Sequence, residues 1–250
     1  MILASCSGCA HSPSPFDGTW KTNLDRSKFS PEPIIFSVNN GMYDCCVPKV
    51  HVKADGSDQP LTGQPSTTIA VKEIDPHTTT IVVKREGKLV SEQMRAASED
   101  GRTLHAKTTL YPLEGNKPII QEVTAERVGN PMSGANVASG SWRTQKMSGS
   151  ENLLLVTFKV SGSKASMSAS SGVSWTAKFD GKNYPVKGSY TEDSVSLKRI
   201  DDRTIEASYK ASGTLSRVSK MTVSLDGKTM TSVSESKLTG RISTYVATKQ

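Results

Sequence analysis

An internal repeat constrains this chain more than any other feature of its sequence. The stretch EDGRTL at 99–104 returns as LDGKTM at 225–230, 126 residues further on. Other matches follow in the same order, at an offset that drifts only from 122 to 126. Many matches in one order indicate a tandem duplication. They pair Gly18 with Gly140, Trp20 with Trp142, Asp55 with Asp180, Lys72 with Lys198, Asp75 with Asp201, Gly87 with Gly213 and Asp100 with Asp226.

The repeated letters are mostly those of β-turns. An Asp-Gly pair favours a type I′ hairpin, in which both central residues adopt positive φ. The sequence therefore predicts such hairpins at residues 100–101 and 226–227. Gly87 and Gly213 predict another equivalent pair of hairpins by the same logic.

Between these turns the residues alternate between apolar and polar. The stretches IAVK at 69–72 and VSLK at 195–198 both place apolar residues at odd positions. Because the offset of 126 is even, the same face of the strand points inward in both copies. The stretch LSRVSKMTV at 215–223 alternates poorly, which predicts an edge strand or a bulged one. Asp75 and Asp201 are placed to close Asx-turns.

Counting the runs between turn signals gives about seven to eight strands per copy. We therefore expect an all-β fold of two tandem antiparallel meander domains, each a barrel or a strongly curved sheet of about eight strands. The expected divisions are a tail at 1–15, a first repeat at 16–128, a Gly- and Ser-rich linker at 129–139 and a second repeat at 140–250.

Each copy opens on the pattern G-x-W, as Gly18-Thr19-Trp20 and Gly140-Ser141-Trp142. Together with the meander that follows, this resembles the lipocalin-like (calycin) barrels, and the longer repeated string resembles a module of secreted bacterial proteins. The resemblance implies that Trp20 and Trp142 lie at a barrel floor and close one end. It therefore assigns Gly18, Trp20, Gly140 and Trp142 structural roles. Two half-barrels that close together remain an alternative.

The chain begins MILASCSGCAHSPSP, in which Leu3–Cys6 resembles the lipobox of bacterial lipoproteins. That resemblance implies a signal peptide, lipidation of Cys6 and an exported bacterial protein, periplasmic or anchored to the outer membrane. The other interpretation is that Cys6 and Cys9 form a C-x-x-C redox or metal pair, which normally needs a strand–helix setting. No run of 18 apolar residues is present, so membrane contact is expected only through the lipid.

The chain is basic, with 31 Lys and Arg against 24 Asp and Glu, a net charge of +7. The charges are scattered singly among polar residues, as in VKREGKLVSEQMR at 83–95. No block of five like charges occurs. The pattern is typical of a solvated β surface, and we expect no nucleic-acid partner.

No motif of catalysis is recognisable in the sequence. The metalloprotease, P-loop, nucleophile-elbow and dinucleotide patterns are all missing from it. The repeated aspartates are explained by turn geometry. We therefore expect a protein that is not an enzyme and has no cofactor. The four histidines are isolated from one another, and we expect His77, in the turn at 75–78, to be a surface residue. They are His11, His51, His77 and His105.

The stretch MYDCCVPKVH at 42–51 has no counterpart in the second copy. Its Asp44, Cys45, Cys46 and His51 are residue types that bind Zn²⁺ or Cu⁺. Adjacent residues on a strand point to opposite faces, however, which makes them poor joint ligands. We therefore expect no metal site and a structural or redox-idle pair, in which one cysteine pairs with Cys9 or the two form a vicinal disulfide.

Architecture favours one function over the others. A barrel offers a natural cavity, so we expect non-enzymatic binding of a small apolar or amphipathic ligand by residues that the sequence does not identify. The alternative is a structural or protein-interaction module of the cell envelope without a ligand cavity. A hydrolase, or an enzyme acting on a fatty or isoprenoid ligand, is the least favoured possibility.

Overall fold

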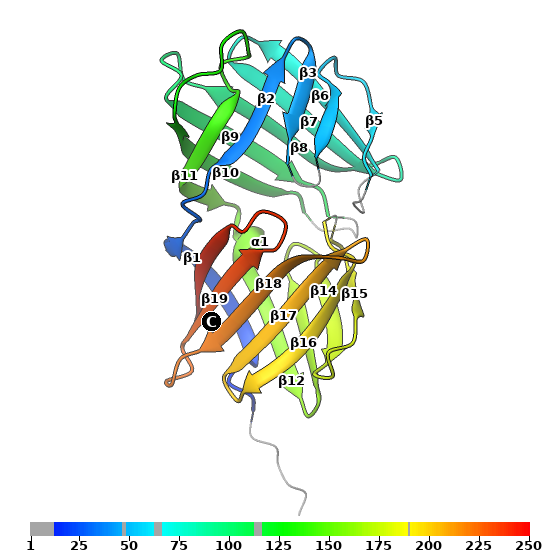
Figure 1. The fold of residues 1–250 in the computed structure, drawn as a ribbon. Helices are drawn as coiled ribbons and strands as arrows, with labels where there is room; N and C mark the ends of the chain where they lie inside the picture. The colour runs from blue at the N-terminus through cyan, green and yellow to red at the C-terminus, as the bar shows by residue number, and fades with distance from the viewer. Residues whose placement is uncertain (1–12, 47–48, 63–66, 113–116, 190) are drawn as a thin grey trace, which may run out of the picture.

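The computed structural model describes residues 13–46, 49–62, 67–112, 117–189 and 191–250. Within these ranges the chain forms twenty strands and one helical turn, α1 (Glu151–Leu154). The strands make two antiparallel sheets of ten strands each, stacked end to end (Figure 1). The expected all-β fold with two barrel-like sheets is confirmed. The expected strand count of about eight is too low, because strands of two to four residues are too short to show alternation.

The N-terminal barrel, the upper one in Figure 1, contains strands β2 to β11 with neighbours in chain order. Because β11 pairs with β2, the sheet curls round on itself. Its two edge strands, β4 and β5, do not pair with each other. The strands are β2 (Ile34–Asn39), β3 (Met42–Cys45), β4 (Val50–Lys53), β5 (Gln59–Pro60), β6 (Thr68–Asp75), β7 (Thr78–Arg85), β8 (Lys88–Ala97), β9 (Thr103–Leu110), β10 (Ile119–Val128) and β11 (Gly140–Gly149).

The C-terminal barrel, the lower one in Figure 1, is a closed ring of ten strands. Nine of them come from the end of the chain and one from its beginning. The strands are β1 (Gly18–Lys28), β12 (Leu155–Ser161), β13 (Lys164–Ala169), β14 (Ser174–Lys178), β15 (Tyr184–Lys187), β16 (Ser194–Asp201), β17 (Thr204–Ala211), β18 (Thr214–Val223), β19 (Thr229–Ser236) and β20 (Ile242–Lys249).

The two copies exchange their first strands. β1, which opens the first copy, lies in the C-terminal barrel between β12 and β20, with Trp20 opposite Val156 and Lys249. β11, which opens the second copy, takes the equivalent place in the N-terminal barrel between β2 and β10. The sheets therefore divide the chain differently from the sequence repeats.

Two short crossings connect the barrels. The first, residues 29–33, contains two prolines, and the Ser30 amide donates to Ser243 Oγ at 3.1 Å. The second runs through α1, and the Ser150 amide donates to the Ile120 carbonyl at 2.9 Å. Between the barrels, Arg85 Nη1 donates to the Ser189 carbonyl at 3.0 Å. The first crossing is thus bonded to the C-terminal barrel and the second to the N-terminal barrel.

The hairpins predicted at Gly87 and Gly213 are confirmed. Glu86 and Gly87 have φ of 51° and 77°, and Ser212 and Gly213 have φ of 48° and 81°. Positive φ at both central residues is the signature of a type I′ turn. The Asx-turn at Asp75 is confirmed as well, since its Oδ1 accepts the His77 amide at 2.8 Å, and Asp201 accepts the Arg203 amide in the same way.

The type I′ prediction for the Asp-Gly pairs is wrong. In the loop after β8, Gly101 has a positive φ of 67° but Asp100 does not. In the loop after β18, Gly227 has a positive φ of 70° but Asp226 does not. These loops are longer than two residues, with the Ser98 amide bonded to the Thr103 carbonyl. Asp100 instead organises the loop through its carboxylate, which accepts bonds from Ser98 Oγ at 2.6 Å and the Arg102 amide at 3.0 Å.

The predicted inward faces are confirmed in both copies. Val71 and Leu197, at equivalent positions, are both buried, with 0% and 1% of their surface exposed. Each barrel has its own apolar core, built on Phe36 in the N-terminal barrel and Phe158 in the C-terminal one. The poorly alternating β18 is a bulged strand inside the sheet, with a register shift after Tyr209 of its neighbour.

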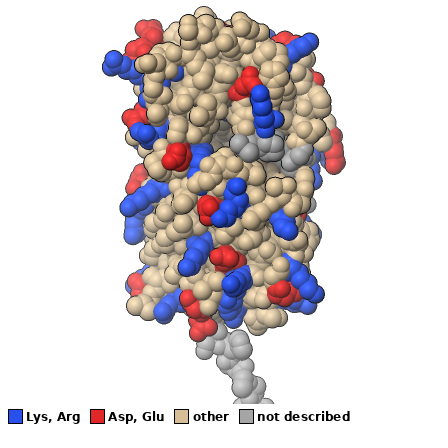
Figure 2. Space-filling view, viewed as in Figure 1, with Lys and Arg blue, Asp and Glu red and all other residues tan. Residues whose placement is uncertain are grey.

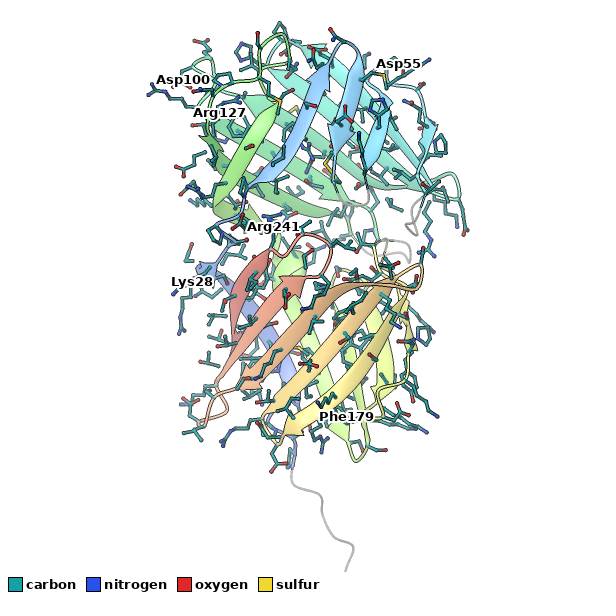
Figure 3. All side chains as sticks on the ribbon, viewed as in Figure 1. Lys28, Asp55, Asp100, Arg127, Phe179 and Arg241 are labelled. Atoms are coloured by element: carbon teal, nitrogen blue, oxygen red, sulfur yellow. A yellow bond between two sulfur atoms is a disulfide. The ribbon has the colours of Figure 1, made fainter. Side chains whose placement is uncertain are left out.

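The outer end of the N-terminal barrel is closed by Trp142. Its indole Nε1 donates to the Ala138 carbonyl at 2.8 Å, and Arg127 lies over the ring at 4.2 Å. Figure 3 labels Arg127 at this end of the barrel. Gly140 has φ of 139°, and a Cβ there would overlap the Arg127 guanidinium. Residues 129–139, expected as a linker, include the buried Asn136, Ala138 and Ser139 and cover this end.

The outer end of the C-terminal barrel repeats this arrangement. Trp20 is fully buried, and its Nε1 donates to the Phe16 carbonyl at 2.8 Å. Lys249 takes the place of Arg127, with its Nζ 5.0 Å from the Trp20 ring and 3.0 Å from the Pro15 carbonyl oxygen. Because the two tryptophan ends face away from each other, the opposite ends of the barrels meet at the junction (Figure 1).

The surface charges are mixed in sign. Figure 2 shows Lys and Arg interspersed with Asp and Glu over both barrels, without a broad area of one sign on this face. In the described part of the chain, no helix has the length and apolar character needed to cross a membrane.

Candidate functional site

The inward-facing residues of the N-terminal barrel change in burial and polarity along the barrel axis. Towards the outer end it is packed by the buried core around Trp142. Towards the junction, the same inward face of strands β8 to β11 is mostly made of residues that are only partly buried, although Ile119 at the end of β10 is buried. This half of the interior is therefore less tightly packed and more polar than the half around Trp142. The partly buried residues are Gln93, Arg95, Ala106, Thr108, Gln121, Val123, Thr144 and Met147.

Arg95 lies at the boundary between the two halves. Its guanidinium carbon is 4.1 Å from the centre of the Phe36 ring, and its Nη1 donates to the Tyr43 hydroxyl at 3.2 Å. Its Nε donates to Gln93 Oε1 at 2.6 Å, and Gln93 Nε2 in turn donates to Thr108 Oγ1 at 2.7 Å. The cation is thus positioned by neutral groups from three strands.

No carboxylate neutralises Arg95 among the residues that the structure describes. A charge inside a barrel is costly unless water or an anion accompanies it. The three remaining donors of a guanidinium that already donates twice are suited to an oxyanion. Arg95 is therefore the strongest candidate for contact with a polar ligand.

The C-terminal barrel also carries an inward arginine, but this one is paired. Arg217 binds Glu192 through two bonds, Nε to Oε1 at 2.8 Å and Nη2 to Oε2 at 2.9 Å. It stacks on Tyr209 at 3.9 Å. Burial alone would lower the pKa of Arg217, but its contacts with Glu192 and Tyr209 raise it overall. The Arg217 charge is therefore already neutralised within the protein.

The packing of the two interiors differs at equivalent positions. Where the C-terminal barrel has Trp175 and Tyr209, both buried, the N-terminal barrel has the smaller Val50 and Val83. The indole of Trp175 donates to the Tyr209 hydroxyl at 3.3 Å, which fills the space between β14 and β17. The N-terminal barrel consequently has the smaller side chains at these two interior positions.

A seam between β4 and β5 opens the wall of the N-terminal barrel. In the C-terminal barrel the equivalent strands pair through their backbones. Here the side chain of Gln59 replaces that ladder, accepting the Lys53 amide at 2.8 Å and donating to the Lys53 carbonyl at 2.8 Å. A pocket of about 290 Å³ lies on the seam, and the core residues Val50 and Val52 and the partly buried Leu61 line it.

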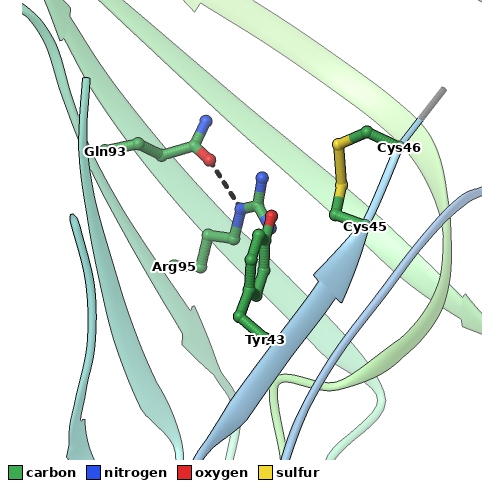
Figure 4. Close-up of a disulfide and its surroundings, with 5 residues drawn as sticks. All are labelled: Tyr43, Cys45, Cys46, Gln93 and Arg95. Atoms are coloured by element: carbon green, nitrogen blue, oxygen red, sulfur yellow. Dashed lines mark hydrogen bonds between the residues drawn. A yellow bond between two sulfur atoms is a disulfide. The ribbon is translucent and has the colours of Figure 1, made fainter. Parts of the chain in front are cut away.

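The cysteines of β3 form a vicinal disulfide, Cys45–Cys46. Of the alternatives for this pair, the structure thus shows the bond between neighbours. Cys45 points into the core and is 7% exposed, whereas Cys46 is exposed. Figure 4 shows the bond beside Tyr43 and Arg95, at the edge of the candidate site.

Asp44 and His51 lie on the other face of the β3–β4 hairpin. His51 Nδ1 and Asp44 Oδ1 are 2.8 Å apart, and this hydrogen bond holds the pKa of Asp44 below its usual value. The four side chains that the sequence groups as metal-ligand types are thus divided between two faces. In the part of the chain that the structure describes, no three His, Cys, Asp or Glu residues form a group that could hold a metal ion.

The remaining candidates lie away from this site. Gly18, Trp20, Gly140 and Trp142 are at the outer ends of the barrels, where they pack and close the cores. Cys6, the expected lipidation site, lies outside the described residues, as do Cys9 and His11.

The sequence analysis missed Arg95 and Gln93 because it took the charges of residues 83–95 as a solvated surface. The signal was present in the alternation, since Gln93, Arg95 and Ala97 share the odd-numbered face of β8 and Ala97 packs on the core. Comparison with protein-family models, with curated proteins and with solved structures finds no match for this chain.

Proposed function

We propose that the protein is a non-enzymatic binding protein that holds a small amphipathic ligand inside its N-terminal barrel. The polar end of the ligand contacts Arg95, and its apolar part lies against the neighbouring core. The observation that supports this most directly is the inward guanidinium of Arg95, which is partly exposed and bonded only to neutral groups.

An amphipathic ligand fits the interior better than a purely apolar one. The Phe36 side of the barrel interior is buried and apolar, whereas the Gln93, Arg95 and Thr108 side offers donors and a positive charge. A hydrocarbon would leave these polar groups without partners, which costs free energy. The lipocalin-like resemblance of the G-x-W strands adds support, because such barrels hold ligands in their interiors.

The seam between β4 and β5 is the proposed route for the ligand. It is held by one glutamine side chain in place of a backbone ladder, and its pocket is lined by core residues. A side-chain clip of this kind opens with less disruption than a paired strand.

A binding experiment with two ligands of equal chain length tests the proposal. Dodecanoate and dodecanol are titrated against the whole chain, with displacement of the fluorescent probe 1-anilinonaphthalene-8-sulfonate as the signal. We expect dodecanoate to bind the wild-type chain, and Arg95→Met to weaken it roughly tenfold or more through the lost charge-assisted hydrogen bonds. The exposed Arg102→Met is the matched control and is expected to leave binding unchanged.

Failure of both ligands to bind would overturn the proposal. The alternative, a cell-envelope interaction module, would then be favoured, because the unpaired edges of β4 and β5 are suited to strand addition by a partner.

Export and lipid anchoring through Cys6 complete the proposal. Residues 14–17 are bound to the outer end of the C-terminal barrel, where the Asp17 carboxylate accepts the Val160 amide at 2.6 Å. An anchor attached ahead of them would hold that end towards the membrane and leave the N-terminal barrel at the far end. Intact-mass spectrometry of the protein from its host tests this, and an unmodified Cys6 would contradict it.

A further inference from the structure

We propose that the Cys45–Cys46 disulfide is a reversible thiol–disulfide exchange site, in which Arg95 stabilises the thiolate that leaves on reduction. This goes beyond ligand binding and beyond the structural or redox-idle role expected of the pair. It rests on three observations: the exposure of one cysteine, the positive φ of Cys46 and the position of Arg95 on Phe36, the cross-strand neighbour of Cys45.

The two sulfurs differ in access. Cys46 is exposed, whereas Cys45 is 7% exposed and belongs to the core cluster of the barrel. Exchange requires a thiolate to approach one sulfur while the other leaves. An external thiolate therefore reaches Cys46, and Cys45 is the leaving group.

The bond also imposes a disfavoured backbone. Cys46 has φ of 75°, which is uncommon for a residue with a side chain. At the equivalent position of the second copy, Ser168 is an ordinary strand residue, and β13 continues to Ala169. β3 ends instead at Cys45. Reduction removes the constraint and lets Cys46 return to extended backbone, which favours opening.

Arg95 supplies the charge that the leaving thiolate needs. Cys45 pairs with Phe36 across the β2–β3 ladder, and the Arg95 guanidinium lies on that Phe36 ring at 4.1 Å. Tyr43, two residues before Cys45 on the same face, accepts a hydrogen bond from Arg95. A neighbouring cation lowers the pKa of a thiol, and a thiol of lower pKa leaves faster.

The reaction balances with a dithiol as the reductant. One thiolate of the dithiol attacks the sulfur of Cys46, the Cys45–Cys46 bond breaks, and Cys45 leaves as a thiolate on the side of the barrel that carries Arg95. The second thiolate of the dithiol attacks the mixed disulfide and releases Cys46. The dithiol departs as its own disulfide, and the protein has gained two electrons and two protons.

Timed reduction of the whole chain tests the proposal. The protein is exposed to dithiothreitol, free thiols are trapped with N-ethylmaleimide, and the tryptic peptide 29–49 is weighed. That peptide holds Cys45 and Cys46 but neither Cys6 nor Cys9, so the signal belongs to this bond. Reoxidation is followed in the same way after the dithiothreitol is removed.

We expect complete and reversible reduction of the folded wild-type chain. Reduction of Arg95→Met should be roughly threefold slower or more, because the leaving thiolate loses the neighbouring cation. Arg102→Met should match the wild type. Circular dichroism of each variant shows that it is folded. A bond that is reduced only after unfolding, or equal rates for Arg95→Met and Arg102→Met, would overturn the proposal.

Discussion

Equivalent residues of the two copies show which positions share one structural role and which have diverged. Thr79 and Ile205 occupy the same inward position of β7 and β17, and each is 1% exposed. The hydroxyl of Thr79 has no hydrogen-bond partner among the described residues. Since the second copy places an apolar side chain here, the hydroxyl is not required by the fold.

Replacing Thr79 by valine is therefore expected to stabilise the protein. The change keeps the volume and removes a buried polar atom that lacks a partner, which should raise the free energy of unfolding by about 1 kcal/mol. Urea denaturation measures it, with Thr80→Val on the outward face of the same strand as the control. A loss of stability in Thr79→Val would show that the hydroxyl is bonded, for example through buried water.

At the scale of elements, the Asp-Gly loops depend on a carboxylate more than on a turn type. Hydrogen bonds from Ser98 Oγ and the Arg102 amide hold the pKa of Asp100 below its usual value of 3.8. Ser224 and Lys228 do the same for the pKa of Asp226. A lowered pKa in the folded state means that the ionised carboxylate stabilises the loop.

This stabilisation has a defined pH dependence. It is fully present above about pH 4, where the unfolded chain is also ionised, and is lost as the pH falls through the lowered folded-state pKa. We expect Asp100→Asn and Asp226→Asn to lower the urea concentration at the unfolding midpoint at neutral pH. We also expect that midpoint to fall less between neutral and acidic pH than it does in the wild type. Both effects should be larger in the double variant. The exposed Asp202→Asn serves as control. An unchanged acid profile in the double variant would contradict the role of these carboxylates.

The seam between β4 and β5 is an element-scale feature with its own prediction. Gln59→Ala removes both bonds to the Lys53 backbone, each of which is worth about 1 kcal/mol or less at an exposed site. We expect amide hydrogen exchange of β4 to accelerate by roughly tenfold. The β14 segment, whose backbone pairing is intact, is the internal control, and equal protection of β4 in both proteins would show that Gln59 does not hold the seam.

At the scale of the molecule, the exchanged first strands link the two barrels. The N-terminal barrel is contiguous from Ile34 to Gly149, whereas the C-terminal barrel is complete only when β1 returns from the start of the chain. Without β1, strands β12 and β20 lose their shared partner and the core loses Trp20. The two barrels should therefore differ in their dependence on the N-terminus.

A chain shortened to start at Phe29 tests this asymmetry. We expect the N-terminal barrel to keep its amide protection and the C-terminal barrel to lose it, with recovery when a peptide of residues 13–28 is added. A chain that starts at Pro13 is the control and should retain both barrels. Protection of the C-terminal barrel in the absence of β1 would show that it closes without the exchanged strand.

Local chemistry made several parts of the fold predictable. The duplication, the inward faces of β6 and β7 and the Glu86-Gly87 hairpin depend on residues close together in the chain, so alternation and turn letters reveal them. The short strands β3 and β5 carry too few residues for a pattern. The pairing of Cys45 with Cys46 was left among alternatives, because composition cannot say which thiols meet.

The exchange of β1 and β11 could not be read from the sequence for a physical reason. Because the copies share their pattern, a G-x-W strand presents the same inward face and the same tryptophan to either barrel. Alternation and turn chemistry therefore do not distinguish a first strand that stays in the barrel of its own copy from one that joins the other barrel. Contacts between residues distant in the sequence decide which barrel it joins. Likewise, Arg95 reads as a surface charge until the closing of the barrel sets it against Phe36 and Tyr43. Residues near in sequence thus determined the strands and turns, and contacts between distant residues decided the partners of those strands and the character of the interior.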